Sequence, residues 1–112
     1  KLEDFLNETT AYASLVHGDL WSGNVLFSKE QVYLIDPAIY FGDREVDIAM
    51  SEMFGGFSKS FYESYKKTLP LSSAYEKKKE IYNLYHFLNH YNLFGVSYLR
   101  ECEEKLTFIE KL

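Results

Sequence analysis

Two short runs of β-forming residues, separated by a polar turn, most constrain the fold of this chain. Residues 25–27 (VLF) and 32–35 (VYLI) flank the turn at residues 28–31, which is the pattern of a β-hairpin. Pro37 lacks the amide hydrogen that a strand ladder needs, so the second strand should end at Asp36. The hairpin would therefore carry the chain out from Asn24 and return it to Asp36.

From residue 46 onward, the apolar residues follow helical spacing instead. We expect four helices, with apolar stripes over residues 46–57, 61–69, 75–92 and 99–109. Gly55 and Gly56 should end the first, Ser58 should cap the second, Pro70 should stop it, and Gly95 should break the third. Leu2, Phe5 and Leu6 share helical spacing, so the chain should also open within a helix. The predicted fold class is α+β, mostly helical with one small hairpin.

Composition narrows the class of protein. The length of 112 residues suits one domain, and the aromatic content of 18% predicts a folded core. The net charge of −5 argues against a nucleic-acid partner. Cys102 is the only cysteine, which excludes an internal disulfide and suits a reducing compartment. No apolar run approaches the ~20 residues of a membrane span, so we expect a cytoplasmic protein with no membrane partner.

Asp19, Asn24 and Asp36 have the spacing that phosphoryl transfer uses. Asn24 follows Asp19 by five residues, and Asp36 follows Asn24 by twelve. In kinases, one Asp accepts the proton of the acceptor hydroxyl, while an Asn and a second Asp hold Mg²⁺ on the nucleotide phosphates. We therefore predict that Asp19 is the catalytic base and that Asn24 and Asp36 bind Mg²⁺ and, through it, ATP.

Two departures from the protein-kinase pattern favour a small-molecule acceptor. Gly18 stands where the H-R-D motif has Arg, and residues 36–38 (DPA) stand where D-F-G is expected. Arg in that motif commonly meets a phosphorylated activation loop, and the Gly of D-F-G lets that loop move. Gly18 and Pro37 instead resemble the aminoglycoside and choline kinase group.

The resemblance can be narrowed to one family. Residues 15–24 (LVHGDLWSGN), 35–38 (IDPA) and 40–50 (YFGDREVDIAM) resemble the catalytic region of fructosamine (ketosamine-3) kinases, as do residues 54–57 and 83–95. The resemblance covers roughly residues 12–100. It implies the C-terminal lobe of a protein-kinase-like fold, and ATP-dependent phosphorylation of a sugar hydroxyl on a free or protein-linked ketosamine.

The parts that hold the nucleotide phosphates are not visible. Only sixteen residues precede His17, and they contain no glycine-rich loop and no strand lysine suited to the task. We expect residues 1–112 to be a C-terminal catalytic lobe without the N-terminal lobe, and to be inactive alone. The surface that the missing lobe would cover should favour self-association.

Several further residues have two interpretations each. His17 is expected to be structural and bonded to backbone, and Trp21 either packs the loop or stacks on the acceptor. Asp47 is either an N-cap or a carboxylate that binds backbone amides of the catalytic loop. His86 and His90 are four apart on one helix. They lack an evident third ligand for a metal, but they could bind substrate hydroxyls if their face lines the acceptor pocket.

Two rival functions remain from other classes. A metallophosphoesterase also uses His-Gly-Asp and Gly-Asn fragments, yet it needs several histidines to hold two metals. This chain has three histidines, and none comes directly after Gly23-Asn24, where Val25 stands. The other rival is a non-catalytic fragment that keeps the fold and binds without turnover.

Overall fold

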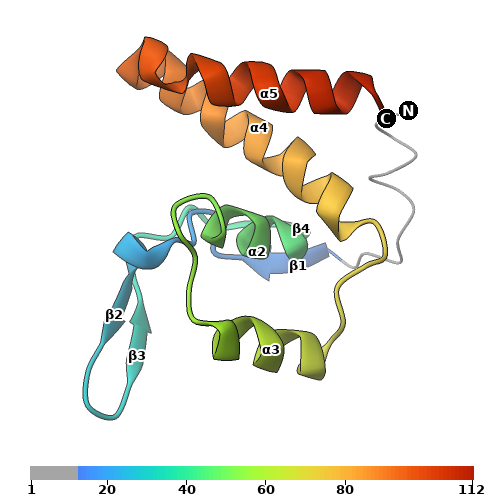
Figure 1. Cartoon of the computed structure of the whole chain (residues 1–112). Helices are drawn as coiled ribbons and strands as arrows, with labels where there is room; N and C mark the ends of the chain where they lie inside the picture. Colours follow the sequence, from blue (N-terminus) through green and yellow to red (C-terminus); the bar gives the residue numbers. More distant parts are fainter. Residues whose placement is uncertain (1–12) are drawn as a thin grey trace. The chain divides into compact units, whose positions relative to one another are not determined.

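The computed structural model describes residues 13–112, so the helix expected at residues 2–6 lies outside the described residues (Figure 1). The chain divides into two compact units. Within residues 13–112, one unit ends at Ser72 and contains the strands, and the other runs from Ser73 to Leu112 and is helical. None of the helices between residues 13 and 112 combines the length and apolarity that crossing a membrane requires.

Two small antiparallel sheets build the strand-containing unit. β2 (Val25–Phe27) pairs with β3 (Val32–Leu34), which confirms the expected hairpin. β1 (Ala13–Val16) pairs with β4 (Tyr40–Asp43), and Val16 lies opposite Tyr40. A short 3-10 turn, η1 (Ser22–Asn24), leads directly into β2. The predicted catalytic loop, residues 17–24, therefore runs from the end of β1 to the start of β2.

The β1–β4 sheet was not expected from the sequence. Its second strand contains Gly42 and Asp43, two residue types that are depleted in strands. The Tyr40 ring leaves no room for a side chain at Gly42, because a Cβ built there would stand 2.7 Å from a ring carbon. Close approach of another group is a common reason for glycine inside a strand.

Helix α2 (Glu45–Ser51) is shorter than the helix expected over residues 46–57. The chain leaves helical geometry after Ser51 and turns through Gly55 and Gly56, whose φ angles of 91° and 72° are left-handed. α3 (Lys59–Thr68) begins as predicted, because the Ser58 side chain accepts a hydrogen bond from the Phe61 amide at 3.3 Å. It ends two residues before Pro70.

The helical unit is a hairpin of two helices that lie side by side (Figure 1). α4 (Tyr75–Phe94) ends at Gly95, which has a φ of 85°, and a short 3-10 turn, η2 (Val96–Tyr98), leads into α5 (Leu99–Glu110). Phe87 of α4 and Cys102 of α5 are buried. Lys105 of α5 reaches Glu80 of α4 at 2.5 Å, so a charge pair accompanies the apolar contact.

Candidate active site

The ring of His17 connects the start of the catalytic loop to the end of strand β3. Its Nδ1 accepts a hydrogen bond from the Asp19 amide at 3.2 Å, and its Nε2 lies 2.8 Å from the Ile35 carbonyl oxygen. An acceptor at Nδ1 requires the proton to sit on Nε2, which then donates to Ile35. Both nitrogens are therefore engaged with backbone, and the ring has no free atom with which to shuttle a proton.

The carboxylate of Asp47 fixes the same loop from the side of α2. Its two oxygens accept hydrogen bonds from the backbone amides of His17, at 2.8 Å, and Gly18, at 2.9 Å. Arg44, not Asp47, occupies the N-cap position of α2. Of the two interpretations of Asp47, the hydrogen bonds match a carboxylate that holds the loop. Bonds from backbone amides to a charged acceptor are among the stronger ones in proteins.

Asp19 and Asn24 are in direct contact. The Asn24 Nδ2 donates to the backbone oxygen of Asp19 at 2.9 Å and to its carboxylate Oδ2 at 3.0 Å. Asn24 is only 6% exposed, so its orientation is constrained by the surrounding loop. With both amide hydrogens directed to Asp19, Oδ1 is the side-chain atom of Asn24 that is left for a cation.

Backbone hydrogen bonds on both sides of Asp36 tie its segment to Asn24 and to His17. The Ile35 amide donates to the Asn24 carbonyl oxygen at 2.9 Å, and the Ala38 amide donates to that of His17 at 2.8 Å. Asp36 itself has a φ of 48°, and it is the one non-glycine residue with positive φ in the described part of the chain. Such a conformation persists only where neighbouring contacts impose it, and it is frequent at functional sites.

Gly18 is required by the same close approach. Its φ is 87°, and a Cβ built at this position would lie 2.0 Å from the Ala38 carbonyl oxygen. No side chain fits there without moving the backbone of residues 36–38. This contact explains in physical terms why the position that holds Arg in protein kinases holds glycine here.

The donor set suits Mg²⁺ better than a transition metal. Within residues 13–112, no group of three or more His, Cys, Asp or Glu side chains gathers in a way that could hold a metal ion. The ligands predicted from the sequence are the hard oxygens of Asn24 and Asp36, and Mg²⁺ is usually bound by one or two such protein groups, with phosphate and water completing its shell. The histidine cluster of a two-metal phosphoesterase is therefore absent from the described residues.

Comparison with known proteins identifies the family. Residues 1–111 match the family model described as fructosamine kinase. The chain belongs to the fructosamine kinase family. It is 50% identical over 102 residues to a "Probable ketoamine kinase" of Vibrio parahaemolyticus, covering 91% of this chain and 35% of that protein. It is 41% identical over 98 residues to the ketosamine-3-kinase of Mus musculus, covering 88% and 32%.

Solved structures agree with this family assignment. The fold matches a crystal structure of a fructosamine-3-kinase candidate from Haemophilus somnus with a TM-score of 0.85 and 35% identity, over 95% of this chain and 37% of that one. The α+β fold expected from the sequence is thereby confirmed. The chain spans about a third of the length of the curated fructosamine kinase relatives that it matches.

Trp21 lies between Asp19 and Asn24, in the predicted catalytic loop of this family member. Its indole covers Gly23 so closely that a Cβ there would stand 2.3 Å from a ring carbon. The ring also meets Phe54 edge-on, with centroids 6.1 Å apart and planes at 67°. The side chain is nevertheless 36% exposed. Trp21 thus packs against the loop and also keeps exposed surface. Both interpretations, packing of the loop and stacking on the acceptor, are compatible with this arrangement.

His86 and His90 belong to α4 in the helical unit. The Nδ1 of His90 lies 2.6 Å from the His86 carbonyl oxygen, and its ring stands 5.1 Å from Tyr98 and 5.7 Å from Phe94. Within residues 13–112, no third His, Cys, Asp or Glu side chain gathers with these two histidines to hold a metal ion. Substrate binding by these two histidines stays a prediction.

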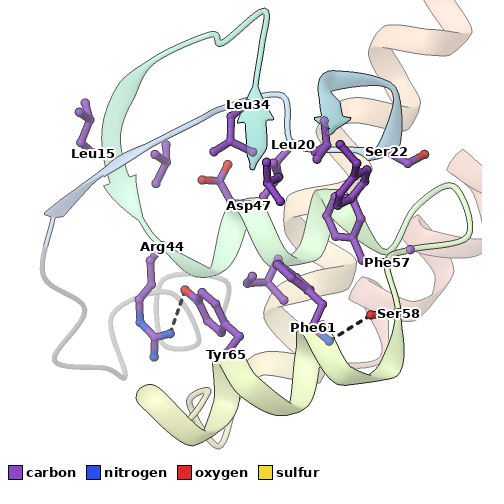
Figure 2. Close-up of a pocket in the computed structure, with 16 residues that line it drawn as sticks. Leu15, Leu20, Ser22, Leu34, Arg44, Asp47, Phe57, Ser58, Phe61 and Tyr65 are labelled. Carbon is purple, nitrogen blue, oxygen red and sulfur yellow. Dashed lines mark hydrogen bonds between the residues drawn. The ribbon is translucent and has the colours of Figure 1, made fainter. Parts of the chain in front are cut away.

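A cavity of about 930 Å³ lies within the strand-containing unit of this family member (Figure 2). Asp19, Asn24 and Asp36, the residues predicted for phosphoryl transfer, are not among the residues that line it. Asp47 does line it, which places the cavity behind the catalytic loop, and most of its wall is apolar, with Leu15, Phe27, Leu34, Phe57 and Phe61 among the lining residues. Sequence analysis did not predict this cavity.

Arg44 lies at the wall of this cavity, as Figure 2 shows, and its role is structural. It donates to the Tyr65 hydroxyl at 3.1 Å and to the Pro70 carbonyl oxygen at 2.6 Å, and it reaches the Glu45 carboxylate only at 4.0 Å. The buried Glu45 accepts instead from the amide and hydroxyl of Ser72. Arg44 and Glu45 therefore fasten the start of α2 to the segment after α3.

Proposed function

We propose that the protein to which this chain contributes transfers the γ-phosphoryl group of ATP to a sugar hydroxyl of a ketosamine. The observation that carries the proposal is the pairing of Asp19 with Asn24, together with the hydrogen bond from the Ile35 amide, next to Asp36, to the Asn24 carbonyl oxygen. These three residue types, at these positions, are the acceptor-facing and metal-facing groups of kinase chemistry. Membership of the fructosamine kinase family gives the reaction class.

Asp19 would accept the proton of the acceptor hydroxyl as its oxygen attacks the γ-phosphorus, and ADP would leave. Asn24 Oδ1 and the Asp36 carboxylate would hold Mg²⁺, which neutralises charge on the phosphates when bound. His17 and Asp47 would touch neither reactant, because their hydrogen bonds are made with the loop itself. They would fix the loop so that Asp19 and Asn24 keep their places, which is the main protein contribution in phosphoryl transfer.

The acceptor class rests on the relatives. One is named a protein-ribulosamine 3-kinase, from Arabidopsis thaliana, and another a ketosamine-3-kinase. A free or protein-linked ketosamine is therefore the acceptor we propose, with Trp21 beside the base and with His86 and His90 as further candidate contacts. A cytoplasmic location is proposed on the same basis as before, from the single cysteine and the absence of a long apolar run.

The 112-residue chain should supply the base and the metal ligands, but not the residues that bind the phosphates of ATP. We propose that it acts as the C-terminal lobe and that the N-terminal lobe of the family holds ATP. The chain alone should then show no measurable turnover, because phosphoryl transfer depends on positioning and charge stabilisation by both parts.

The test compares the chain alone with the chain joined to the N-terminal lobe of the Vibrio parahaemolyticus relative. We expect the joined protein to phosphorylate fructoselysine with ATP and Mg²⁺, as followed by ³¹P NMR, and the chain alone to leave it unchanged. An Asp19→Asn variant of the joined protein controls for contaminating kinases. Phosphorylation of choline or an aminoglycoside, and not of fructoselysine, would show that the acceptor is not a ketosamine. Hydrolysis of a phosphate ester with Mn²⁺, lost in His17→Ala, would favour the phosphoesterase.

A further inference from the structure

The indole of Trp21 is clamped on two sides within the strand-containing unit. Gly23 lies under the ring, with room for no side chain, and the Phe54 ring meets it edge-on at 6.1 Å. Edge-to-face aromatic pairs of this kind fix the relative orientation of the two rings. The orientation of Trp21 therefore depends on where Phe54 is placed.

The segment that carries Phe54 is itself anchored through the Tyr62 hydroxyl. Tyr62 accepts a hydrogen bond from the Phe57 amide at 3.0 Å and pairs with the Ser51 Oγ at 2.9 Å. Ser51 in turn donates to the Ile48 carbonyl oxygen at 2.7 Å, so the Tyr62 hydroxyl is the donor toward Ser51. One hydroxyl thus joins the last residue of α2 to the end of the Gly55-Gly56 turn.

The rings of Trp21 and Phe54 meet edge-on and form a corner that is partly exposed to solvent. Trp21 is 36% exposed and Phe54 is 40% exposed. A pair that served packing alone would be expected to lie in the core, where burial of apolar surface stabilises most. This pair is instead partly exposed, and Trp21 follows Asp19 by two residues along the chain.

We propose that Phe54 is a positioning residue for the acceptor, which acts by holding the Trp21 indole so that its open face stacks on the sugar of the acceptor. The identity of that ligand rests on the proposed function. Tyr62 and Ser51 would maintain the corner by anchoring the segment of Phe54. Sugar recognition by a fixed aromatic face needs the ring to be pre-oriented, because a ring that rotates freely loses entropy when it binds.

Trp21 is the only tryptophan of the chain, so its fluorescence reports on this corner alone. The experiment titrates the 112-residue chain with fructoselysine and follows tryptophan emission. We expect a saturable change in the unsubstituted chain, and a weakening of the apparent affinity by about three- to tenfold in Phe54→Leu, which loses the ring contact. Phe54→Tyr keeps the ring and should retain the affinity.

Phe108→Leu provides the matched control, because Phe108 is 39% exposed and lies on α5 in the other unit. It should titrate like the unsubstituted chain. Tyr62→Phe keeps the ring but removes the anchoring hydroxyl, so it should weaken the affinity in the same direction as Phe54→Leu. It keeps the test decisive if Phe54→Leu fails to fold.

Three results would overturn the inference: no response to fructoselysine in the unsubstituted chain, equal affinities for it and Phe54→Leu, or equal weakening by Phe108→Leu. Failure of the proposed function looks different. An emission response without phosphorylation by the joined protein would remove the kinase assignment and keep the corner as a sugar site. Phosphorylation without an emission response would remove only the role of Phe54.

Discussion

At the residue scale, Asp19 and Asp36 should fail in different ways when replaced. In the joined enzyme, Asp19→Asn should leave nucleotide affinity nearly intact and lower kcat by about 10²- to 10⁴-fold, the usual contribution of a general base. Asp36→Ala should abolish Mg²⁺-dependent nucleotide binding, because its carboxylate would touch the ion. Calorimetric titration with ATP and Mg²⁺, alongside steady-state kinetics, separates the two effects.

Asn24→Asp is a useful companion to these variants. It keeps an oxygen for the cation but loses the Nδ2 donor that holds Asp19 at 2.9 and 3.0 Å. It should retain metal binding and lose turnover. If Asp19→Asn and Asp36→Ala were to lose nucleotide affinity equally, the roles given to the two carboxylates would be wrong.

Gly18 allows a second test with a control inside the same chain. Gly18 and Gly55 have nearly the same left-handed φ, 87° and 91°, but a Cβ at Gly18 meets the Ala38 oxygen at 2.0 Å, whereas a Cβ at Gly55 meets nothing within 4 Å. Gly55→Ala should cost about 1–2 kcal/mol from the backbone conformation alone. Gly18→Ala should cost clearly more, because the backbone of residues 36–38 must move. Urea unfolding of both variants measures the difference, and equal losses would show that the contact with Ala38 is relaxed at little cost.

At the scale of elements, the sequence predicted the parts whose pattern is local. The hairpin of β2 and β3, the Ser58 cap of α3 and the break of α4 at Gly95 each depend on a few adjacent residues, and each is present. The β1–β4 sheet was missed because its strands are only four residues long and are separated in the sequence by residues 17–39. The first helix was predicted to extend to residue 57, because the apolar residues keep their helical spacing beyond Ser51. In the structure the helix ends at Ser51.

The candidate site divides in the same way. The contact between Asp19 and Asn24 follows from a spacing of five residues in one loop, so the sequence could indicate it. The anchoring of Phe57 by Tyr62, and of Tyr62 by Ser51, depends on the turn between α2 and α3, which no periodicity reveals. The long-range hydrogen bonds of Arg44 to Tyr65 and Pro70 were missed for the same reason.

Cys102 provides a probe of the α4–α5 hairpin. Burial, followed by the negative charges of Glu101 and Glu103, raises the pKa of this thiol above its ordinary value. The folded state therefore holds the proton more tightly, so its stabilising effect is present at neutral pH and is lost as the pH rises through the thiol range. Iodoacetamide at pH 8 should alkylate Cys102 far more slowly in the folded chain than in urea, because only the thiolate reacts. Similar rates in the two conditions would mean that the helical hairpin opens readily.

At the scale of the whole molecule, the exposed apolar side chains predict self-association. Leu15, Phe27, Val32, Leu34 and Phe41 of the strand-containing unit are all more than half exposed. Burying several hundred Å² of such surface is worth several kcal/mol at about 25 cal/mol per Å², before the costs of association. The net charge of −5 opposes this only weakly at physiological salt, where the screening length is about 8 Å.

We therefore expect a dimer or larger assembly of the 112-residue chain at micromolar concentration. Sedimentation equilibrium at tens of micromolar measures the mass directly. Phe27→Asp and Phe41→Asp, which place a charge on this surface, should shift the equilibrium toward monomer, while Phe108→Asp on α5 provides the comparison. A monomeric mass for the unsubstituted chain would show that the exposed side chains do not drive association.

The close approach of Gly18 to Ala38 limits how an enzyme with this loop can evolve regulation. In protein kinases, a phosphorylated activation loop is ordered by arginine contacts, so a cell can switch activity by modifying the enzyme. Here, the backbone of residues 36–38 occupies the space that any side chain at position 18 would need. An arginine at position 18 would therefore displace residues 36–38, which include Asp36. A lineage with this loop would have to place such a switch at another position.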